Sequence, residues 1–317
     1  MSSTNELDPE LRPVVDLVAA AAPDDPEVAG VDRLRADYAG FAAVVGDGPA
    51  VGEEEDVEVA GPAGPVPVRL YRPVSSSGVP GLVVFLHGGG FTIGGLDTHA
   101  AVCRRLCAGS GAVVASVDYR LAPEAPYPAA VDDAWAALVG LVGRAAELGV
   151  DPDRVAVVGD SAGGNLATVL ARRARDAGGP ALRLQALVYP VCDLTHDADR
   201  YPSLRTNGAG YLLTAATMRF FADRYLPDPA RRTEPDASPL RAADLSGLAP
   251  ALVVVAGLDP LLDEGVAYAG ALAAAGVVVQ LERFDGAVHM TYQLAEVTGV
   301  GARMADTVVD AVRRALS

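Results

Sequence analysis

The chain has 317 residues, half of them apolar, so it can bury a sizeable core in one large domain or two modest ones. Acidic residues outnumber basic residues by 41 to 25, and the net charge of −16 disfavours nucleic acids and anionic membrane surfaces as partners. All 25 basic residues are Arg, which excludes a serine–lysine dyad, a Schiff base and a phosphate-loop lysine. A catalytic base that works near neutral pH is therefore expected among four histidines, His87, His99, His196 and His289.

No segment is typical of a membrane span or an export signal. The uncharged residues 74–96 contain seven Gly and are a poor candidate for a membrane helix. Residues 1–8 carry two acids, no base and no apolar run, so we expect a cytoplasmic protein. The three Cys are odd in number and lack a C-x-x-C spacing, which indicates neither a disulfide framework nor a zinc site.

The N-terminal part of the chain is predicted to be helical and then to change to strands. Apolar residues recur at helical spacing through residues 7–46, where Pro23 and Pro26 interrupt the pattern. Residues 46–55 are rich in Gly and acids and are predicted to form a linker. Two alternating segments at 57–60 and 66–71, separated by a Gly-Pro turn, predict a pair of strands.

Beyond this pair, short apolar runs alternate with helical stretches. Buried strands are predicted at 82–86, 112–117, 155–158, 184–189, 251–256 and 277–281. Helices are predicted at 98–108, 129–148, 164–177 and 264–275. This alternation favours an α/β fold with a mostly parallel, doubly wound sheet that carries helices on both faces. Residues 194–249, with one helix expected at 214–225, interrupt the alternation and are interpreted as an insertion over the sheet.

The sequence G-D-S-A-G at residues 159–163 matches the G-x-S-x-G pattern of a serine nucleophile. A predicted strand precedes it and a predicted helix follows it, as a sharp strand-to-helix turn requires. Such a turn needs small neighbours, and it presents the hydroxyl of Ser161 at a helix N-terminus. The alternative interpretation is an ordinary Gly-rich loop.

The sequence H-G-G-G at residues 87–90 follows the predicted strand 82–86. Acyl transfer requires stabilisation of an oxyanion, and backbone N–H groups provide it where no side chain blocks their approach. We expect Gly88 and Gly89, together with Ala162 after the nucleophile, to form this oxyanion hole. A plain glycine turn between two elements is the alternative.

His289 lies beyond the last predicted strand and is the candidate base. Hydrolases with a G-x-S-x-G turn between a strand and a helix order their triad along the chain as Ser, acid, His. The acid is then expected after a strand between Ser161 and His289. Asp259 directly follows the strand 251–256 and is favoured. Asp263, one turn further on, is expected to cap the next helix. Asp285 lies close to His289 in sequence but leaves a different strand.

Together these residues resemble the hormone-sensitive-lipase-like family of bacterial esterases, often called family IV. The resemblance covers most of the chain from about residue 60 onward and rests on four motifs in the family's order. These motifs are H-G-G-G at 87–90, G-D-S-A-G-G at 159–164, D-P-L-L-D-E-G at 259–265 and D-G-A-V-H at 285–289. A further family segment, Y-R-L-A-P-E at 119–124, is expected to be structural.

Three positions depart from the family pattern. Leu262 stands where Arg is usual, Met290 replaces the Gly that commonly follows the catalytic His, and Ala125 replaces a frequent His. None removes a member of the triad. Met290 lies beside the base, so we expect it to alter the pocket there and with it the substrate preference.

The resemblance implies the α/β-hydrolase fold, with a helical cap built from residues 1–46 and 194–249 over a core of residues 47–193 and 250–317. It implies hydrolysis of short- to medium-chain acyl esters without a cofactor or metal, and a possible homodimer. Candidates for the wall of the substrate pocket are Phe91, Leu212, Leu213, Phe220 and Met290, although core packing explains the first four equally well.

The predicted function is that of a serine carboxylesterase acting on a small-molecule ester. An amidase, lactonase or carbamate hydrolase with the same triad remains open, because the oxyanion chemistry is shared. A non-catalytic small-molecule receptor on this fold is a third hypothesis, which the intact set of motifs disfavours.

Overall fold

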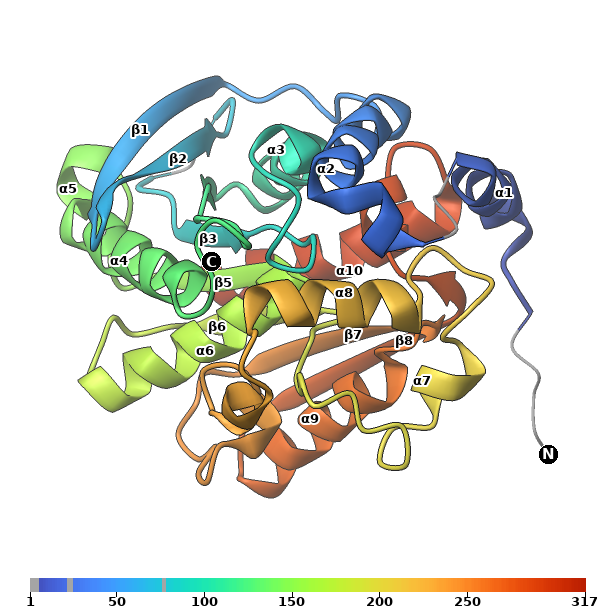
Figure 1. Ribbon diagram of the computed structural model, residues 1–317. Helices are drawn as coiled ribbons and strands as arrows, with labels where there is room; N and C mark the ends of the chain where they lie inside the picture. Colours follow the sequence, from blue (N-terminus) through green and yellow to red (C-terminus); the bar gives the residue numbers. More distant parts are fainter. Residues whose placement is uncertain (1–5, 22–24, 76–77) are drawn as a thin grey trace.

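The computed structural model describes residues 6–21, 25–75 and 78–317 and contains one eight-stranded sheet (Figure 1). The strand order is β1-β2-β4-β3-β5-β6-β7-β8. Strands β1, β2 and β4 pair in antiparallel fashion, and all pairs from β4–β3 to β7–β8 are parallel. The fold is therefore an α/β-hydrolase fold with a mostly parallel sheet, as the sequence predicts.

Each predicted strand is present, although β1 begins at Glu53, inside the segment predicted as a linker. They are β1 (Glu53–Gly61), β2 (Gly64–Arg72), β3 (Leu82–Leu86), β4 (Val113–Val117), β5 (Val155–Asp160), β6 (Leu184–Val188), β7 (Ala251–Leu258) and β8 (Val279–Val288). Every residue of β3 is buried, because alternate side chains enter two different cores. Leu82, Val84 and Leu86 pack on one face of the sheet, whereas Val83 and Phe85 pack on the other.

Helices cover both faces of the sheet. One face carries α4 (Ala129–Gly143), α5 (Ala145–Leu148), α6 (Ala162–Ala177) and α9 (Leu262–Ala274). The other carries α3 (Ala100–Ser110) and α10 (Gly299–Leu316), which pack on each other as well as on the sheet. The predicted helix 129–148 is two helices, because the chain leaves helical geometry at Arg144.

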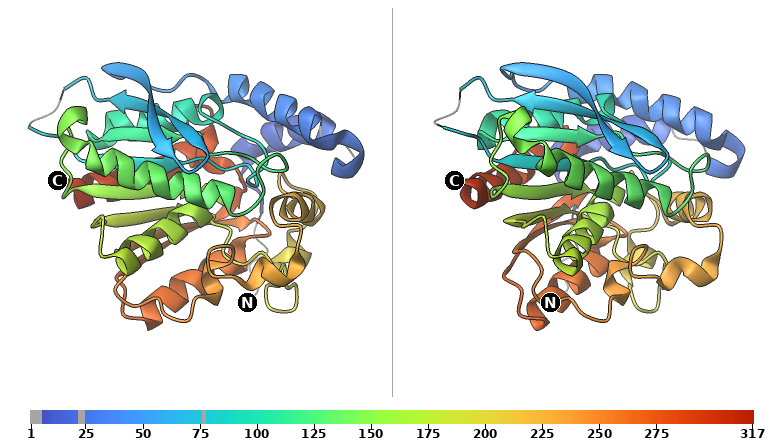
Figure 2. Two further views of the ribbon diagram at one scale, coloured as in Figure 1. Left: turned by 60° about the vertical axis from the view of Figure 1, so that its left-hand side comes forward. Right: turned by 90° about the vertical axis from the view of Figure 1, so that its left-hand side faces the viewer.

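The N-terminal helices and the insertion lie at one end of the molecule. Helices α1 (Arg12–Ala21) and α2 (Pro26–Val45) and helix α8 (Ala215–Tyr225) gather on the same side in both views of Figure 2. The short elements η1 (Pro9–Leu11), α7 (Ser203–Thr206), η3 (Pro229–Thr233) and η4 (Pro239–Arg241) complete these two segments. Pro26 opens α2 at its first turn, with Asp25 as the N-cap, so it begins a helix instead of interrupting one. Pro23 lies outside the described residues.

One predicted boundary is wrong in a way that matters for the site. The last strand was expected to end at residue 281, yet β8 continues to Val288. A shift in its pairing with β7 between Ala256 and Leu258 lets both strands extend together. As a result, β7 and β8 end side by side, directly before Asp259 and His289. Short turns η2 (Asp97–His99) and η5 (Thr291–Leu294) follow β3 and β8. In the described part of the chain, no helix combines the length and apolar character that crossing a membrane requires.

Candidate active site

Ser161 occupies the sharp turn between β5 and α6. Its backbone is in the left-handed region, with φ 55° and ψ −118°, a strained conformation that costs about 1–3 kcal/mol in a residue other than Gly. The Ser161 N–H donates to the carbonyl of Val188 at 2.9 Å, which fixes the turn against β6. A Cβ on Gly159 would lie 2.3 Å from the Gly163 oxygen, and one on Gly163 would lie 1.9 Å from the Leu86 oxygen. The turn therefore requires glycine at both outer positions of the motif.

The three side chains predicted as a triad meet at the carboxyl ends of β5, β7 and β8. His289 Nε2 lies 2.9 Å from Ser161 Oγ, and His289 Nδ1 lies 2.7 Å from Asp259 Oδ2. The second oxygen of Asp259 accepts the Leu261 N–H at 2.9 Å. Because the buried carboxylate accepts from Nδ1, Nε2 is left free to accept the proton of the serine hydroxyl.

The other candidate acids have different partners. Asp263, in the first turn of α9, accepts the Ser203 N–H at 2.7 Å. It does not cap that helix as expected, because Leu261 is the N-cap residue. Asp285 lies within β8 and forms an ion pair with Arg283 on the same strand.

The remaining histidines are not close partners of Ser161. The His87 ring stacks on Tyr119 at 4.2 Å, and burial together with the repulsion of His99 lowers the pKa of His87 to about 3. His99 contacts Asp160, with its Nε2 3.2 Å from Oδ1. His196 lines the pocket described below, where burial and the nearby Arg232 lower its pKa to about 4.

The glycine motif corrects one prediction. The Gly88 N–H donates to Asp160 Oδ1 at 3.0 Å, so it is not available to an oxyanion, and its assignment to the oxyanion hole was wrong. Gly89 and Gly90 line the pocket, whereas Gly88 does not. Both have positive φ, 122° and 60°, and a Cβ on Gly90 would lie 2.2 Å from the ring of Phe221 on α8.

Three backbone N–H groups remain as possible oxyanion donors. For Gly89 and Gly90, the described residues include no acceptor of these N–H groups. Ala162 is the first residue of α6, so its N–H has no partner within the helix. Sequence reasoning missed Gly90, because all three glycines of the motif look equivalent until the partner of Gly88 is known.

A cavity of about 540 Å³ opens over Ser161 and His289. Its wall is mostly apolar and comes from the core, from the N-terminal helices and from the insertion. The lining residues include Leu17, Val18, Leu34, Tyr38, Phe41, Phe91, Ile93, Val191, Leu194, Leu212, Leu213, Met218, Phe221, Leu261 and Met290. Four of the five predicted wall residues, Phe91, Leu212, Leu213 and Met290, are therefore in the wall.

Phe220 is not in the wall, and this prediction was wrong. Its ring is buried beneath the guanidinium of Arg224, which lies 3.4 Å from the ring centroid, and it packs edge-on against Phe221. The next residue on α8, Phe221, takes the expected place in the cavity.

The nucleophile turn also carries a buried charge. Burial alone would raise the pKa of Asp160, but the nearby His99, the hydrogen bonds to His99 and Gln293, and the more distant His289 together hold that pKa below its ordinary value. Asp160 is therefore a carboxylate at neutral pH. Across the residues with assigned positions, no group of His, Cys, Asp and Glu is arranged to hold a metal ion.

Comparisons with known proteins show which family this chain resembles. A family profile described as the alpha/beta hydrolase fold matches residues 83–293. The chain is 44% identical over 325 residues to "Carboxylic ester hydrolase LipN" of Mycobacterium tuberculosis, covering 99% of this chain and 84% of that protein. It is 46% identical over 231 residues to "Ethyl acetate hydrolase" of Pseudomonas putida, covering 71% and 70%. A solved structure of a hyperthermophilic esterase from Pyrobaculum calidifontis superimposes with a TM-score of 0.93 at 38% identity, covering 98% of each chain.

Proposed function

Because this chain is a carboxylic ester hydrolase of the α/β-hydrolase family, in its hormone-sensitive-lipase-like branch, we propose that Ser161, His289 and Asp259 are its catalytic triad. The observation that carries the proposal is the continuous chain of contacts from Asp259 through both ring nitrogens of His289 to Ser161 Oγ, at 2.7 and 2.9 Å. This chain opens into an apolar cavity in which an ester can lie.

In the first half of the reaction, Ser161 Oγ attacks the ester carbonyl carbon while its proton passes to His289 Nε2. The buried Asp259 carboxylate stabilises the imidazolium that forms. The tetrahedral intermediate collapses, the alcohol leaves with the proton from His289, and an acyl-serine remains. Water then gives its proton to His289 and attacks the acyl carbon, and Ser161 departs with that proton as the carboxylic acid is released.

The oxyanion of both tetrahedral intermediates is held by the backbone N–H groups of Gly89, Gly90 and Ala162. The support for this set is that Gly88 is engaged by Asp160, whereas Gly89 and Gly90 line the cavity. Ala162 contributes its N–H from the first residue of α6, where the helix dipole also favours negative charge.

The substrates are esters with short- to medium-chain acyl groups. A cavity of about 540 Å³ is within the usual range for small-molecule sites, and its apolar wall suits hydrocarbon chains. The names of two relatives, a carboxylic ester hydrolase and an ethyl acetate hydrolase, point to the same class. Residues 1–46 and 194–249 act as a cap, since α1, α2 and the insertion all contribute to the wall of the cavity.

The decisive experiment is replacement of Ser161 by Ala. Hydrolysis of p-nitrophenyl butyrate is expected to fall by about 10⁴-fold or more, because the nucleophile is lost while the binding groups remain. The thermal unfolding temperature reports whether the variant is folded. Ser110→Ala, at the end of α3 with its hydroxyl bonded to the Leu106 carbonyl, is the matched control and should retain full activity. Near wild-type hydrolysis by a folded Ser161→Ala variant would reject the proposed function.

A further inference from the structure

The carboxylate of Asp160 is almost completely buried beside the nucleophile and binds three different segments of the chain. One oxygen accepts the Gly88 N–H at 3.0 Å. The other lies 3.3 Å from His99 Nε2 and 3.2 Å from Gln293 Nε2. Because Gly88 directly precedes the glycines that face the cavity, the position of this carboxylate fixes the start of the glycine loop.

Gln293 connects Asp160 to the N-terminal helices. Its side chain is buried, and its nitrogen lies 2.8 Å from His99 Nε2 and 2.7 Å from the phenolic oxygen of Tyr38. Gln293 belongs to η5, the turn that directly follows His289 and Met290. One amide group therefore joins the loop of the proposed base, the carboxylate next to the nucleophile and a residue of α2.

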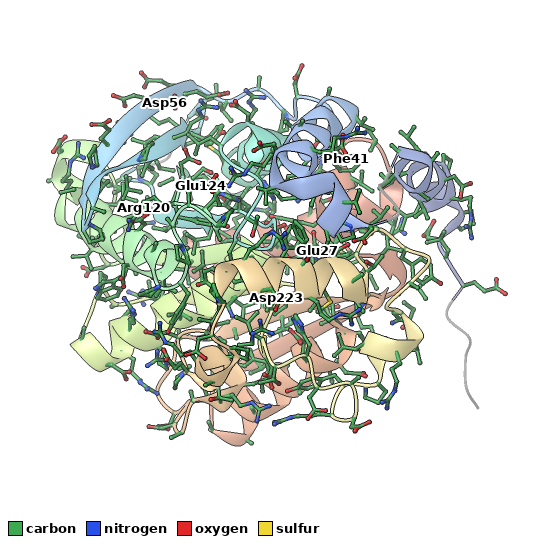
Figure 3. The ribbon with its side chains drawn as sticks, in the orientation of Figure 1. Glu27, Phe41, Asp56, Arg120, Glu124 and Asp223 are labelled. Atoms are coloured by element: carbon green, nitrogen blue, oxygen red, sulfur yellow. The ribbon has the colours of Figure 1, made fainter. Side chains whose placement is uncertain are left out.

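Helix α2 holds the glycine loop from a second position. Arg35, one turn before Tyr38, donates to the carbonyls of Thr92 at 2.9 Å and Ala122 at 3.0 Å. It also forms a two-pronged ion pair with Glu124, which lies beside α2 in Figure 3. Residues three apart share a face of a helix, so Arg35 and Tyr38 fix that face of α2 against the loop.

We propose that Gln293 and Tyr38 are positioning residues for ester hydrolysis. They link the position of α2 over the cavity to the Asp160 carboxylate, which in turn holds the glycine loop. The inference rests on the proposed function, because it concerns the placement of the Gly89 and Gly90 N–H groups against an oxyanion. When α2 packs over the cavity, the Tyr38 hydroxyl holds the amide of Gln293 in place. That amide orients the Asp160 carboxylate, and the carboxylate holds the Gly88 N–H. A displacement of this loop by about 1 Å is enough to lower the rate strongly.

The test compares two single variants with their combination. Tyr38→Phe keeps the ring in the cavity wall and removes only the hydroxyl, so kcat is expected to fall about fivefold, as for loss of one ordinary hydrogen bond. Gln293→Met keeps the length of the side chain and removes all its polar contacts, so kcat is expected to fall about tenfold or more. The double variant should be no slower than Gln293→Met alone, because Tyr38 acts only through that amide.

Two further readouts separate positioning from a structural role. KM should stay within about twofold, since the apolar wall is unchanged, whereas loss of a substrate contact would raise KM. The inhibition constant of a trifluoromethyl ketone, which forms a tetrahedral adduct with the nucleophile, should rise by the same factor as kcat/KM falls. Tyr127→Phe is the matched control, because its hydroxyl binds Glu234 at 2.9 Å and it does not line the cavity.

An unchanged kcat in Tyr38→Phe would overturn the inference, and so would effects of the two substitutions that simply multiply. A change confined to KM, or an equal loss in Tyr127→Phe, would likewise overturn it. These results are distinct from failure of the proposed function, which would appear as retained hydrolysis in Ser161→Ala.

Discussion

The core and the cap of this molecule build the same cavity in different ways. The core supplies the reacting groups from the ends of buried parallel strands, where Asp259, His289 and Ser161 contact one another and Asp259 also accepts the Leu261 N–H. The proposed cap, residues 1–46 and 194–249, supplies mainly apolar side chains from its described residues. These segments bury apolar side chains such as Val45 and Tyr225, and they also form ion pairs near the surface, such as Arg224–Glu27 and Arg35–Glu124. In Figure 3, Glu27 lies between α2 and α8.

This difference separates chemistry from selection of the substrate. Strand ends in a packed sheet have little freedom, so they hold the triad within the narrow limits that catalysis requires. Helices that meet through partly exposed ion pairs are held less firmly, since such pairs contribute little and are screened by salt. Substitutions of the triad should therefore change kcat by large factors, whereas substitutions of cap residues that only line the cavity should change which esters are used.

The largest effect is expected for Asp259→Asn in the core. An amide at this position favours the wrong tautomer of His289, because it can donate to Nδ1 where the carboxylate only accepts. We expect kcat for p-nitrophenyl butyrate to fall by about 10⁴-fold with little change in KM. Asp263→Asn, in the first turn of the adjacent helix, is the matched control and should lose far less activity. Equal losses in the two variants would contradict the distinct role of Asp259.

The difference between core and cap also determines which site residues can be predicted from the sequence. Ser161 and its turn are predictable, because glycine is required at positions 159 and 163 by contacts with Leu86 and with the turn itself. Asp259 and His289 are predictable from their places after strands, even though the end of β8 was misjudged. In each of these cases the decisive interactions follow from the order of strands and turns.

The errors at Gly88 and Phe220 concern contacts between distant segments. The role of Gly88 depends on Asp160, 72 residues away, and neither motif alone contains that information. Phe220 and Phe221 are neighbours on α8 whose rings point in different directions. Which ring enters the cavity depends on how the helix packs over the core. The contact between Tyr38 and Gln293 spans 255 residues and lies in no motif.

A smaller effect, confined to substrate choice, is expected in the cap for Leu213→Trp. Leu213 lines the cavity, so a larger side chain there takes up space that a long acyl chain needs. The ratio of kcat/KM for p-nitrophenyl octanoate to that for the acetate should fall by about tenfold or more, with the acetate value almost unchanged. Val266→Trp, on the partly exposed surface of α9, should leave the ratio unchanged. If both esters lost activity equally in Leu213→Trp, the wall at this position would not select acyl length.

The smallest effect is expected for Glu124→Gln, which weakens the attachment of α2 to the core. The hydrogen bonds from Arg35 lower the pKa of Glu124 to about 2, although its carboxylate is largely exposed. A carboxyl group with a lowered pKa in the folded state stabilises the protein above the pKa of the unfolded chain, near 4.5, and that contribution is lost as the pH falls toward 2. The variant should therefore melt slightly below the wild type at pH 7, and this difference should shrink at pH 3. High salt at pH 7 should also reduce the difference, because an exposed ion pair is screened. A difference in melting temperature that grew on acidification would show that Glu124 does not act through its ion pair with Arg35.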